Sequence, residues 1–344
     1  MQKIRLTING RRVNAEKGMT VLEAAQQAGI YIPTLCADPD LEPYGSCRLC
    51  VVEIEGMRGL PTACTTPAND GMVVHTETPA VSEIRRLAID LLIADHPVDC
   101  LTCRKNQQCE LQKVAAYLGI TERRFPHTGQ TFEIDTSNPF FDLDRNYCIL
   151  CAKCVRACNE VTGVGAIDLA YRGYQAKVAT FGDKPLFESI CKSCGECMVR
   201  CPVGALMPKM AVQPAYEVKT TCPYCGVGCQ MYLGVKDGQV ISARGDRENE
   251  VNRGRLCVKG RFGATEFIHH PDRLDNPLIR QNGEFHEATW DEALDAVAAG
   301  LGRYKPEEIA IISSAKCTNE ENYLLQKLGR AVIGTHNIDH CARL

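Results

Sequence analysis

The sequence has 344 residues, 21 cysteines and a formal net charge of −3. A chain of this length exceeds one compact domain, and the uneven spacing of its cysteines predicts four or five small domains in series. Its charged residues are well mixed, so no basic stripe indicates nucleic-acid binding. No run of about 18 apolar residues occurs, and the first residues lack the apolar stretch of an export signal. We therefore expect a cytoplasmic protein without a membrane span.

The cysteines repeat a few short spacings along the chain. In a reducing cytosol, cysteines in C-x-x-C pairs indicate metal ligands rather than disulfides. Scattered buried thiols, the simplest alternative, would not repeat a spacing. Nineteen of the 21 cysteines and one histidine sort into five consecutive ligand sets. We interpret the chain as an electron-transfer protein that holds five metal–sulfur centres in series.

Residues 1–78 begin with a predicted hairpin and helix. Residues 3–8 alternate between polar and apolar side chains, Asn9-Gly10 is a strong two-residue turn signal, and residues 11–14 continue as the partner strand. Thr20 and Glu23 have the spacing of a capping box. A helix is therefore expected to begin there and to end near Gly29.

Four cysteines follow in the same segment with a C-x10-C-x2-C-x13-C spacing: Cys36, Cys47, Cys50 and Cys64. Four thiolates from a loop and a returning strand suit a [2Fe–2S] cluster, and Gly45 favours a loop wrapped around it; a zinc site is the alternative. The stretch resembles the β-grasp [2Fe–2S] ferredoxin domain of the complex I large iron–sulfur subunit, of [FeFe]-hydrogenases and of soluble formate dehydrogenases.

Residues 79–120 contain one histidine and three cysteines within fourteen residues: His96, Cys100, Cys103 and Cys109. Zinc also accepts three thiolates and one imidazole. The order of the four ligands, however, resembles the histidine-ligated [4Fe–4S] site of the same three families, and we expect that cluster here. An imidazole in place of a thiolate removes negative charge, which should alter the potential of the cluster.

Residues 138–212 contain an internal repeat. Two runs share a C-x2-C-x2-C-x3-C spacing, formed by Cys148, Cys151, Cys154 and Cys158, and by Cys191, Cys194, Cys197 and Cys201. This is the bacterial two-cluster ferredoxin pattern, in which the fourth cysteine of each run ligates the other cluster. Cys201 is therefore expected to complete the [4Fe–4S] cluster of the first run, and Cys158 that of the second. Because each cluster would tie the two runs together, the cluster-free module should be unfolded.

Residues 215–275 carry a fifth set with a different spacing, C-x2-C-x3-C-x27-C, formed by Cys222, Cys225, Cys229 and Cys257. Glycines between these ligands allow backbone amides to approach the cluster sulfurs. The motif resembles the [4Fe–4S] domain of molybdenum or tungsten bis-pterin oxidoreductases. In that family the lysine two positions after the last cysteine lies between cluster and pterin. The resemblance assigns this electron-transfer role to Lys259.

Residues 276–344 predict the start of an α/β molybdopterin-binding domain. Helices are predicted over residues 291–304 and 318–333, and a strand over residues 308–313. The second helix begins with a capping box of Thr318 and Glu321. Ligands of open α/β sheets lie at the carboxyl ends of the strands. The side chains expected to face the pterin are Ser313, Ser314, Lys316 and Thr318.

Residues 318–323 and 337–344 resemble formate dehydrogenase of the soluble type, whose large subunit carries the same series of iron–sulfur modules. In that family a selenocysteine or cysteine that ligates the metal directly follows such a Cys-Ala-Arg segment, and a catalytic histidine comes next. The resemblance implies that this ligand follows Leu344, either encoded by a UGA codon that was taken as a stop or lost from a shortened fragment. Cys317 and Cys341 are expected to be ordinary buried thiols.

These features predict a multidomain α+β and α/β protein with a β-grasp [2Fe–2S] ferredoxin domain, a cluster domain with one histidine and three cysteine ligands, a two-cluster bacterial ferredoxin domain and the start of a molybdopterin oxidoreductase domain. The resemblance implies the large subunit of a formate dehydrogenase or CO2 reductase. Its cofactors would be one [2Fe–2S] and four [4Fe–4S] clusters, about 18 irons in all, and bis-molybdopterin guanine dinucleotide with molybdenum or tungsten. A flavoprotein, ferredoxin or hydrogenase-type subunit would take the electrons within a hetero-oligomer.

Three other classes share some of these modules. A non-catalytic electron-relay protein would use the clusters alone. A complex I subunit is expected to carry one four-cysteine set where this chain has the eight-cysteine repeat. An [FeFe]-hydrogenase is expected to follow the repeat with its own catalytic-cluster cysteines, whereas here Cys222, Cys225 and Cys229 come next.

Overall fold

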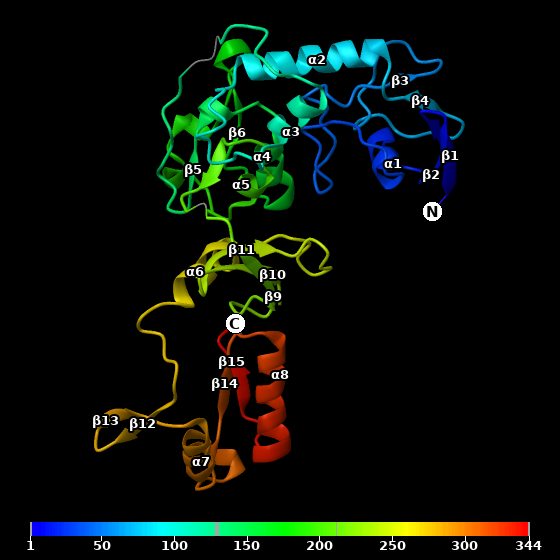
Figure 1. Ribbon diagram of the computed structural model, residues 1–344. Helices are drawn as coiled ribbons and strands as arrows, with labels where there is room; N and C mark the ends of the chain where they lie inside the picture. The colour runs from blue at the N-terminus through cyan, green and yellow to red at the C-terminus, as the bar shows by residue number, and fades with distance from the viewer. Residues whose placement is uncertain (1, 128–130, 211, 343–344) are drawn as a thin grey trace. The chain divides into compact units, whose positions relative to one another are not determined.

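The computed structural model describes residues 2–127, 131–210 and 212–342. Its backbone divides into two compact units, Met1–Ala211 and Val212–Leu344 (Figure 1). The longest helix within the described ranges is α2 (Pro79–Ala94), with 16 residues. None of the helices in these ranges has both the length and the apolar composition of a membrane span.

A four-stranded sheet forms the first part of the first unit. Its strands are β1 (Lys3–Ile8), β2 (Arg11–Glu16), β3 (Glu53–Ile54) and β4 (Val73–His75). They lie in the order β2-β1-β4-β3, with β1 and β4 parallel and the other pairs antiparallel. The predicted hairpin is confirmed, because Asn9 and Gly10 adopt φ angles of 50° and 76°, the left-handed values that a two-residue turn requires. The second strand extends two residues beyond its predicted end.

Helix α1 (Val21–Gln27) begins at the predicted capping box. The Glu23 amide donates to Thr20 Oγ1 at 3.2 Å, and the Thr20 amide donates to Glu23 Oε2 at 2.7 Å. The chain leaves the helix at Gly29, whose φ of 71° is the left-handed conformation that commonly ends a helix. The capping box and the glycine therefore set both ends of α1, as the sequence predicts.

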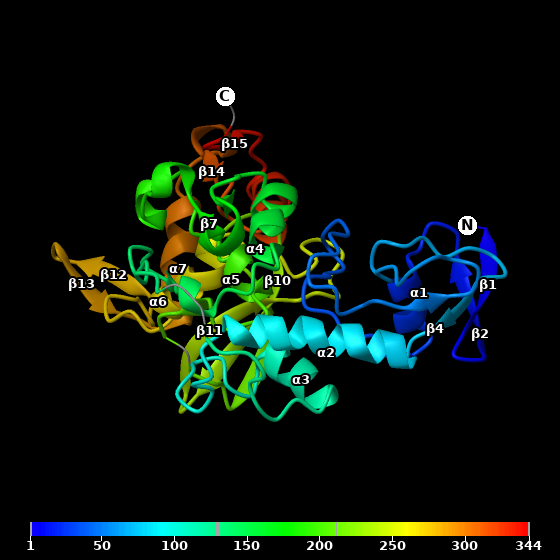
Figure 2. The ribbon, with the colours of Figure 1, turned by 90° about the horizontal axis from the view of Figure 1, so that it is seen from above.

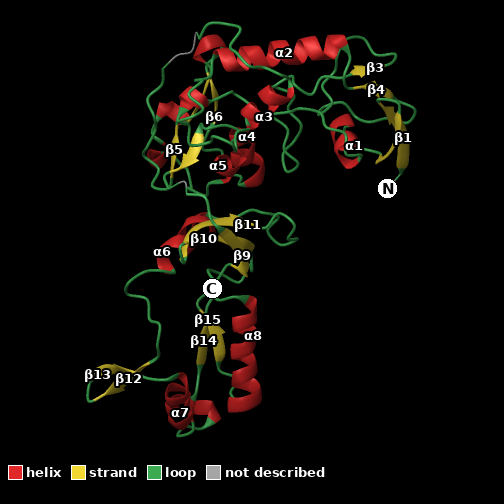
Figure 3. Ribbon diagram, in the orientation of Figure 1, coloured by secondary structure: helices red, strands yellow, loops and turns green. Residues whose placement is uncertain are grey.

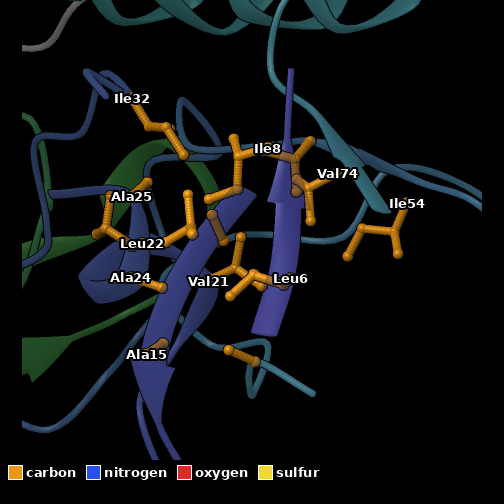
Figure 4. Packing of buried hydrophobic residues seen from close by; sticks show 14 of the residues in the cluster. Leu6, Ile8, Ala15, Val21, Leu22, Ala24, Ala25, Ile32, Ile54 and Val74 are labelled. Atoms are coloured by element: carbon orange, nitrogen blue, oxygen red, sulfur yellow. The ribbon is translucent and has the colours of Figure 1, made fainter. Parts of the chain in front are cut away.

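The core of this domain lies between α1 and the sheet (Figure 4). Alternation along β1 sends Ile4, Leu6 and Ile8 to the same face, where all three are buried. The largest fully buried side chains there include Ile8, Val21 and Val74. This packing fixes the β-grasp arrangement that carries the first four cysteines.

Replacing Ile8 by alanine should loosen this domain. Ile8 is 0% exposed, and removing a buried isoleucine side chain costs about 2–5 kcal/mol. We expect amide hydrogen exchange over residues 3–16 to accelerate by roughly tenfold or more. Lys3→Ala on the same strand is the control, because that side chain is exposed. Equal exchange rates in the two variants would contradict the assigned core.

Helix α2 (Pro79–Ala94) follows the sheet, and helix α3 (Glu110–Tyr117) comes next along the chain (Figure 2). Thr78 Oγ1 caps α2 by accepting a hydrogen bond from the Val81 amide at 3.3 Å. The segment between the two helices carries all four residues of the second set, His96, Cys100, Cys103 and Cys109.

The cysteine repeat forms short antiparallel strand pairs and short helices. Strand β5 (Phe141–Leu143) pairs with β8 (Leu206–Pro208), and β6 (Asp168–Ala170) pairs with β7 (Lys177–Ala179). The helices α4 (Lys153–Arg156) and α5 (Glu196–Arg200) pack against each other. The remaining turns are the 3₁₀ segments η1 (Arg145–Tyr147), η3 (Gly173–Gln175), η4 (Phe181–Asp183) and η5 (Leu186–Glu188), and the π-helical η2 (Ala157–Val161).

The second unit begins with an antiparallel sheet in the order β11-β10-β9. Its strands are β9 (Tyr216–Thr221), β10 (Gln230–Lys236) and β11 (Gln239–Gly245). Next come the π-helical η6 (Lys259–Gly263), helix α6 (Ala264–Phe267) and a hairpin of β12 (Leu278–Gln281) and β13 (Glu284–Glu287). The β9–β10 connection and the segment after β11 carry the fifth cysteine set.

After the hairpin come helix α7 (Trp290–Leu301) and the 3₁₀ turn η7 (Pro306–Glu308). A strand–helix–strand unit follows (Figure 3), made of β14 (Ile311–Ser313), α8 (Asn319–Lys327) with its π-helical continuation η8 (Leu328–Ile333), and β15 (Ile338–His340). Strands β14 and β15 are parallel, which confirms an α/β arrangement.

The three elements predicted for this region are present with shifted ends. Helices α7 and α8 lie within one residue of their predicted starts, and the Thr318 and Glu321 capping box is formed, with the Glu321 amide donating to Thr318 Oγ1 at 3.2 Å. The predicted strand over residues 308–313 begins three residues too early. Pro306 starts a 3₁₀ turn that includes Glu308, and the Glu308 carboxylate accepts from the Lys305 amide at 2.8 Å.

Candidate metal centres

The first cysteine set lies on the loops between α1 and β4. All four thiols are buried, and contacts join Cys36 to Cys47 and Cys64, and Cys64 to Cys50. Hydrogen bonds from the Cys47 and Cys64 thiols hold the pKa of Cys36 well below its usual value, while contacts with Cys36 and Cys50 raise the pKa of Cys64. A [2Fe–2S] cluster requires four thiolates gathered in this way. The donor set therefore fits the expected cluster.

His96 lies in an apolar cavity of about 90 Å³ that Cys100, Cys103 and Cys109 also line. Its Nδ1 atom is buried and has no hydrogen-bond partner among the residues we describe. Burial lowers the pKa of His96 to about 4, so the imidazole is neutral at pH 7. Neutral imidazole is the form that binds a metal. A buried, unpartnered imidazole nitrogen on a residue that shares this cavity with three thiols fits the expected histidine-ligated centre.

The two runs of the ferredoxin repeat have the same backbone conformation. Leu150 and Ser193, each two residues after the first cysteine of a run, adopt φ angles of 53° and 52°, and both amides donate to that cysteine's Sγ at 3.4 Å. Ala152 and Gly195 also match, with φ angles of 57° and 76° immediately before α4 and α5. The sequence repeat is therefore a structural repeat of two cluster-binding loops.

The fold brings the fourth cysteine of each run to the opposite run. Cys201 interacts electrostatically with Cys148, Cys151 and Cys154, and these four line a cavity of about 20 Å³. Cys158 interacts in the same way with Cys191 and Cys197, which also contacts Cys194. The geometry follows the crossed pattern expected from the sequence. The two groups lie close together, because Cys197 also interacts with Cys154 and Cys201.

Each cysteine of the fifth set approaches another member of the set. Cys222 and Cys229 both interact electrostatically with Cys225 and Cys257, and the Cys222 amide donates to the Cys229 carbonyl at 2.8 Å. A Cβ atom added to Gly260 would lie 3.4 Å from Cys222 Sγ, so backbone packs closely against this thiol. Lys259, the first residue of η6, is exposed.

The described side chains form no compact site for a single metal ion. Across residues 2–127, 131–210 and 212–342, no three His, Cys, Asp or Glu side chains lie close enough to hold one metal ion.

The residues expected to face a pterin lie at the carboxyl end of β14, but three of them already make hydrogen bonds. Ser313 Oγ donates to Asn322 Oδ1, and Thr318 Oγ1 caps α8. Ser314 Oγ lies 3.5 Å from Cys341 Sγ, and Lys316 is exposed. Ser314 Oγ also accepts from the Lys316 amide at 3.1 Å, so Lys316 is the one exposed side chain among the four.

The expectation that Cys317 and Cys341 are buried thiols is wrong. Cys341 is exposed and Cys317 is half-buried. Both follow a strand at the carboxyl edge of the β14–β15 pair, where the chain turns out of the sheet. A hydrogen bond with Ser314 lowers the pKa of Cys341.

Sequence analysis did not single out three buried arginines that lie close to cysteine sets. Arg85, Arg156 and Arg200 are 2%, 7% and 5% exposed, respectively. Arg85 in α2 donates to the Val51 carbonyl at 2.9 Å, directly after Cys50. The sequence offered one signal for Arg156 and Arg200: each lies between the third and fourth cysteines of its run.

Five family descriptions match consecutive parts of the chain. They are a 2Fe-2S iron-sulfur cluster binding domain over residues 1–79, the NADH-ubiquinone oxidoreductase-G iron-sulfur binding region over 85–124, the ferredoxin-like domain of NADH-quinone oxidoreductase subunit 3 over 138–207, the molybdopterin oxidoreductase Fe4S4 domain over 215–269, and molybdopterin oxidoreductase over 273–344. This series confirms the predicted fold class.

Several curated proteins are similar over almost the whole chain. The G 2 subunit of NADH-quinone oxidoreductase from Rhizobium meliloti is 40% identical over 99% of this chain and 40% of its own length. The NADPH-Fe(3+) oxidoreductase alpha subunit of Geobacter sulfurreducens is 37% identical over 99% and 40%, and a putative formate dehydrogenase of Staphylococcus aureus is 31% identical over 98% and 39%. The chain thus spans about 40% of the length of these relatives.

A solved NAD+-reducing [NiFe]-hydrogenase chain is also similar, at 34% identity and a TM-score of 0.55 over 60% of this chain and 88% of that one. The ligand sets and folds described above define an iron–sulfur electron-transfer protein. The chain comprises the iron–sulfur domains of a molybdopterin oxidoreductase family. Its relatives include a G-type subunit of NADH-quinone oxidoreductase and a putative formate dehydrogenase.

The ferredoxin-like domain of NADH-quinone oxidoreductase subunit 3 matches residues 138–207, a range that includes both cysteine runs. The expectation that complex I subunits carry one four-cysteine set in this place stays a prediction.

Proposed function

We propose that the chain is the electron-transfer and cofactor-entry region of a formate dehydrogenase that uses molybdenum or tungsten on a bis-molybdopterin guanine dinucleotide. The bound cofactor would supply the two-electron interconversion of formate and CO2. The five ligand sets would hold one [2Fe–2S] and four [4Fe–4S] clusters, which carry electrons singly toward a partner. Cys222, Cys225, Cys229 and Cys257 form the set nearest the cofactor in this proposal.

One packing contact carries the proposal. A Cβ atom added to Gly226, inside the fifth cysteine motif, would lie 3.0 Å from Asn319 Oδ1 and 3.3 Å from the Cys317 carbonyl oxygen. The fifth set's loop therefore packs against the loop that follows β14. Ligands of open α/β sheets bind at this edge, so a cofactor held there by Ser314 and Lys316 would lie beside the set's loop.

Lys259 is the residue that we assign to coupling between the fifth set and the cofactor. It lies two positions after Cys257, at the start of η6, and its side chain is exposed. A cation at this position would favour electron arrival at the cluster because it offsets the added negative charge. Its exposure leaves it free to reach an anionic cofactor.

The choice of formate as substrate rests on the resemblance of residues 318–323 and 337–344 to formate dehydrogenase and on the Staphylococcus aureus relatives of that putative activity. We further propose a cytoplasmic hetero-oligomer in which a flavoprotein, ferredoxin or hydrogenase-type subunit takes the electrons. The similarity to a chain of an NAD+-reducing hydrogenase supports such an assembly.

A second candidate function is electron relay from a nicotinamide-linked partner without formate chemistry. The 40% identity to the G 2 subunit of NADH-quinone oxidoreductase favours this alternative. In that case the cysteine sets would retain their roles, but the β14 loop would hold no catalytic cofactor.

Reduction by formate tests the two candidates in the full-length natural protein, purified without oxygen. If the proposal is correct, formate alone reduces the clusters, observed as bleaching of visible absorbance and appearance of electron paramagnetic resonance signals. Lys259→Ala should retain the iron of the wild type but slow this reduction on the order of tenfold, which corresponds to about 1.4 kcal/mol of barrier. Lys236→Ala is the control, since Lys236 is another exposed lysine of the second unit. Reduction by NADH through its partner but not by formate would favour electron relay.

A further inference from the structure

The loop that follows Cys36 contacts both helices of the ferredoxin repeat. Arg156 at the end of α4 donates to the carbonyl oxygens of Cys36 and Glu42. Arg200 at the end of α5 pairs with Asp40 at 2.8 Å. The Glu42 amide also donates to Glu160 Oε2 at 2.8 Å. These contacts join residues that are more than 100 positions apart in the sequence.

The two arginines differ in how their charges are balanced. Arg200 lies among three carboxylates: it pairs with Glu196 and Asp40, and its Nε is 3.7 Å from Asp38. Its charge is therefore neutralised within the protein. Its ion pair with Asp40 holds the loop that follows Cys36 (the Cys36 loop) against α5. Arg200 needs no further counter-charge.

Arg156 has no such neutralisation. Its side chain is buried, and within the part of the chain that the structure describes no carboxylate pairs with it. Among the described residues its Nε has no hydrogen-bond partner, and its guanidinium lies 5.3 Å from the ring centre of Tyr44. Both of its hydrogen bonds go to backbone carbonyls. A buried guanidinium without an anion is strongly unfavourable, so a counter-charge is expected nearby.

The candidate anions next to Arg156 are thiolate-ligated clusters. Its hydrogen bond ends on the carbonyl of Cys36, a member of the [2Fe–2S] set. Along the chain it lies two residues from Cys154 and two from Cys158, which belong to the two different groups of the ferredoxin repeat. Arg156 thus lies on the chain segment between ligands of the two ferredoxin groups and donates to the backbone of a ligand of the [2Fe–2S] set.

We propose that Arg156 is the shared counter-cation and electron-transfer bridge between the [2Fe–2S] centre and the ferredoxin centres. The inference rests on the proposed function insofar as the cysteine sets hold clusters. Arg156 is a positioning residue: it orients the Cys36 loop, and its charge stabilises the reduced, more negative form of the adjoining centre. Transfer across it moves one electron from one centre to the other, with no bond formed or broken and no co-reactant.

The bridge has a physical basis in its contacts. The path from Cys36 to α4 runs through one hydrogen bond and the arginine side chain, and then through two residues of backbone to Cys154 or Cys158. Net charge and hydrogen bonding near the ligands are among the factors that set cluster potentials. Removing the guanidinium should therefore change both the potential of the [2Fe–2S] centre and the rate at which it exchanges electrons with the repeat.

A redox titration of the cluster-loaded protein, followed by electron paramagnetic resonance, tests the inference. In Arg156→Gln, reduction of the [2Fe–2S] centre should become about tenfold less favourable, a fall in midpoint potential of 59 mV for one electron. Arg156→Lys keeps the positive charge and should restore the potential while electron exchange stays slow, because one ammonium cannot reproduce both hydrogen bonds. Arg172→Gln is the control, since it removes an exposed arginine from the same module.

The outcomes separate this inference from the proposed function. A [2Fe–2S] signal with the same potential in wild type and Arg156→Gln would overturn the inference alone. Absence of that signal from the wild type would overturn the cofactor assignment and the inference with it. If Arg156→Gln and Arg156→Lys both lose their iron while Arg172→Gln keeps it, Arg156 has only a structural role and the inference is wrong.

Discussion

The double variant Cys158→Ala, Cys191→Ala is expected to lose about four irons per chain, no more than either single variant. The reason is the crossed geometry, in which Cys158 approaches Cys191 and Cys197 rather than its own run. If both cysteines ligate one cluster, removing the second releases no further iron once removal of the first has released that cluster. Their effects on iron content are therefore strongly non-additive. Iron analysis of anaerobically purified protein measures the loss.

The matched comparison is the double variant Cys148→Ala, Cys191→Ala. These cysteines have the same position in their respective runs, but they lie in different groups, because Cys148 approaches Cys201. This variant should lose about eight irons, the iron of two [4Fe–4S] clusters. If the Cys158 and Cys191 pair instead lost about eight irons, each run would hold its own cluster, contrary to the crossed assignment. Because metal binding is coupled to folding, digestion by protease should be monitored in parallel.

Replacing His96 by cysteine is expected to keep its cluster but make it harder to reduce. The imidazole is neutral, whereas a thiolate adds one negative charge beside the iron. Histidine-for-cysteine exchanges in other iron–sulfur centres indicate a change on the order of 100 mV or more. A redox titration followed by electron paramagnetic resonance should show a lower midpoint potential for this centre, with the total iron unchanged.

His96→Ala serves as the comparison because it removes the ligand without supplying another. It should lose about four irons and leave the ferredoxin repeat filled. Full iron content in this variant would exclude His96 as a ligand, and loss of the repeat's iron would contradict the modular arrangement. His127→Ala provides a control, since its ring binds the Ala94 carbonyl at 2.8 Å and belongs to no ligand set.

Local sequence signals were sufficient for many elements of the fold. Asn9-Gly10 fixed the first hairpin because both residues accept left-handed φ angles. Capping boxes fixed the starts of α1 and α8 because their hydrogen bonds join residues only three positions apart. The strand predicted over residues 308–313 was too long, because the apolar pattern did not reveal that Pro306 begins a 3₁₀ turn.

In the candidate sites, too, local sequence patterns predicted some features, and packing between distant segments set the others. The repeated spacings identified five cysteine sets, because ligands of one cluster loop lie close along the chain. The exposure of Cys341 was missed, since burial depends on which elements cover the end of β15 rather than on residue type. The buried arginines were missed for the same reason: nothing near Arg156 in the sequence indicates that Cys36 and Glu42 would accept its hydrogen bonds.

Short-range patterns were enough to predict the five ligand sets, the order of the modules and the crossed roles of Cys158 and Cys201, since each rests on spacings within a motif. Two contacts could be found only in the folded chain: the loop that carries Gly226 packs on the loop after β14, and Arg156 reaches the loop that follows Cys36. Such contacts join distant segments and depend on how the elements pack. In the proposed function, these contacts would set the path that electrons take between modules.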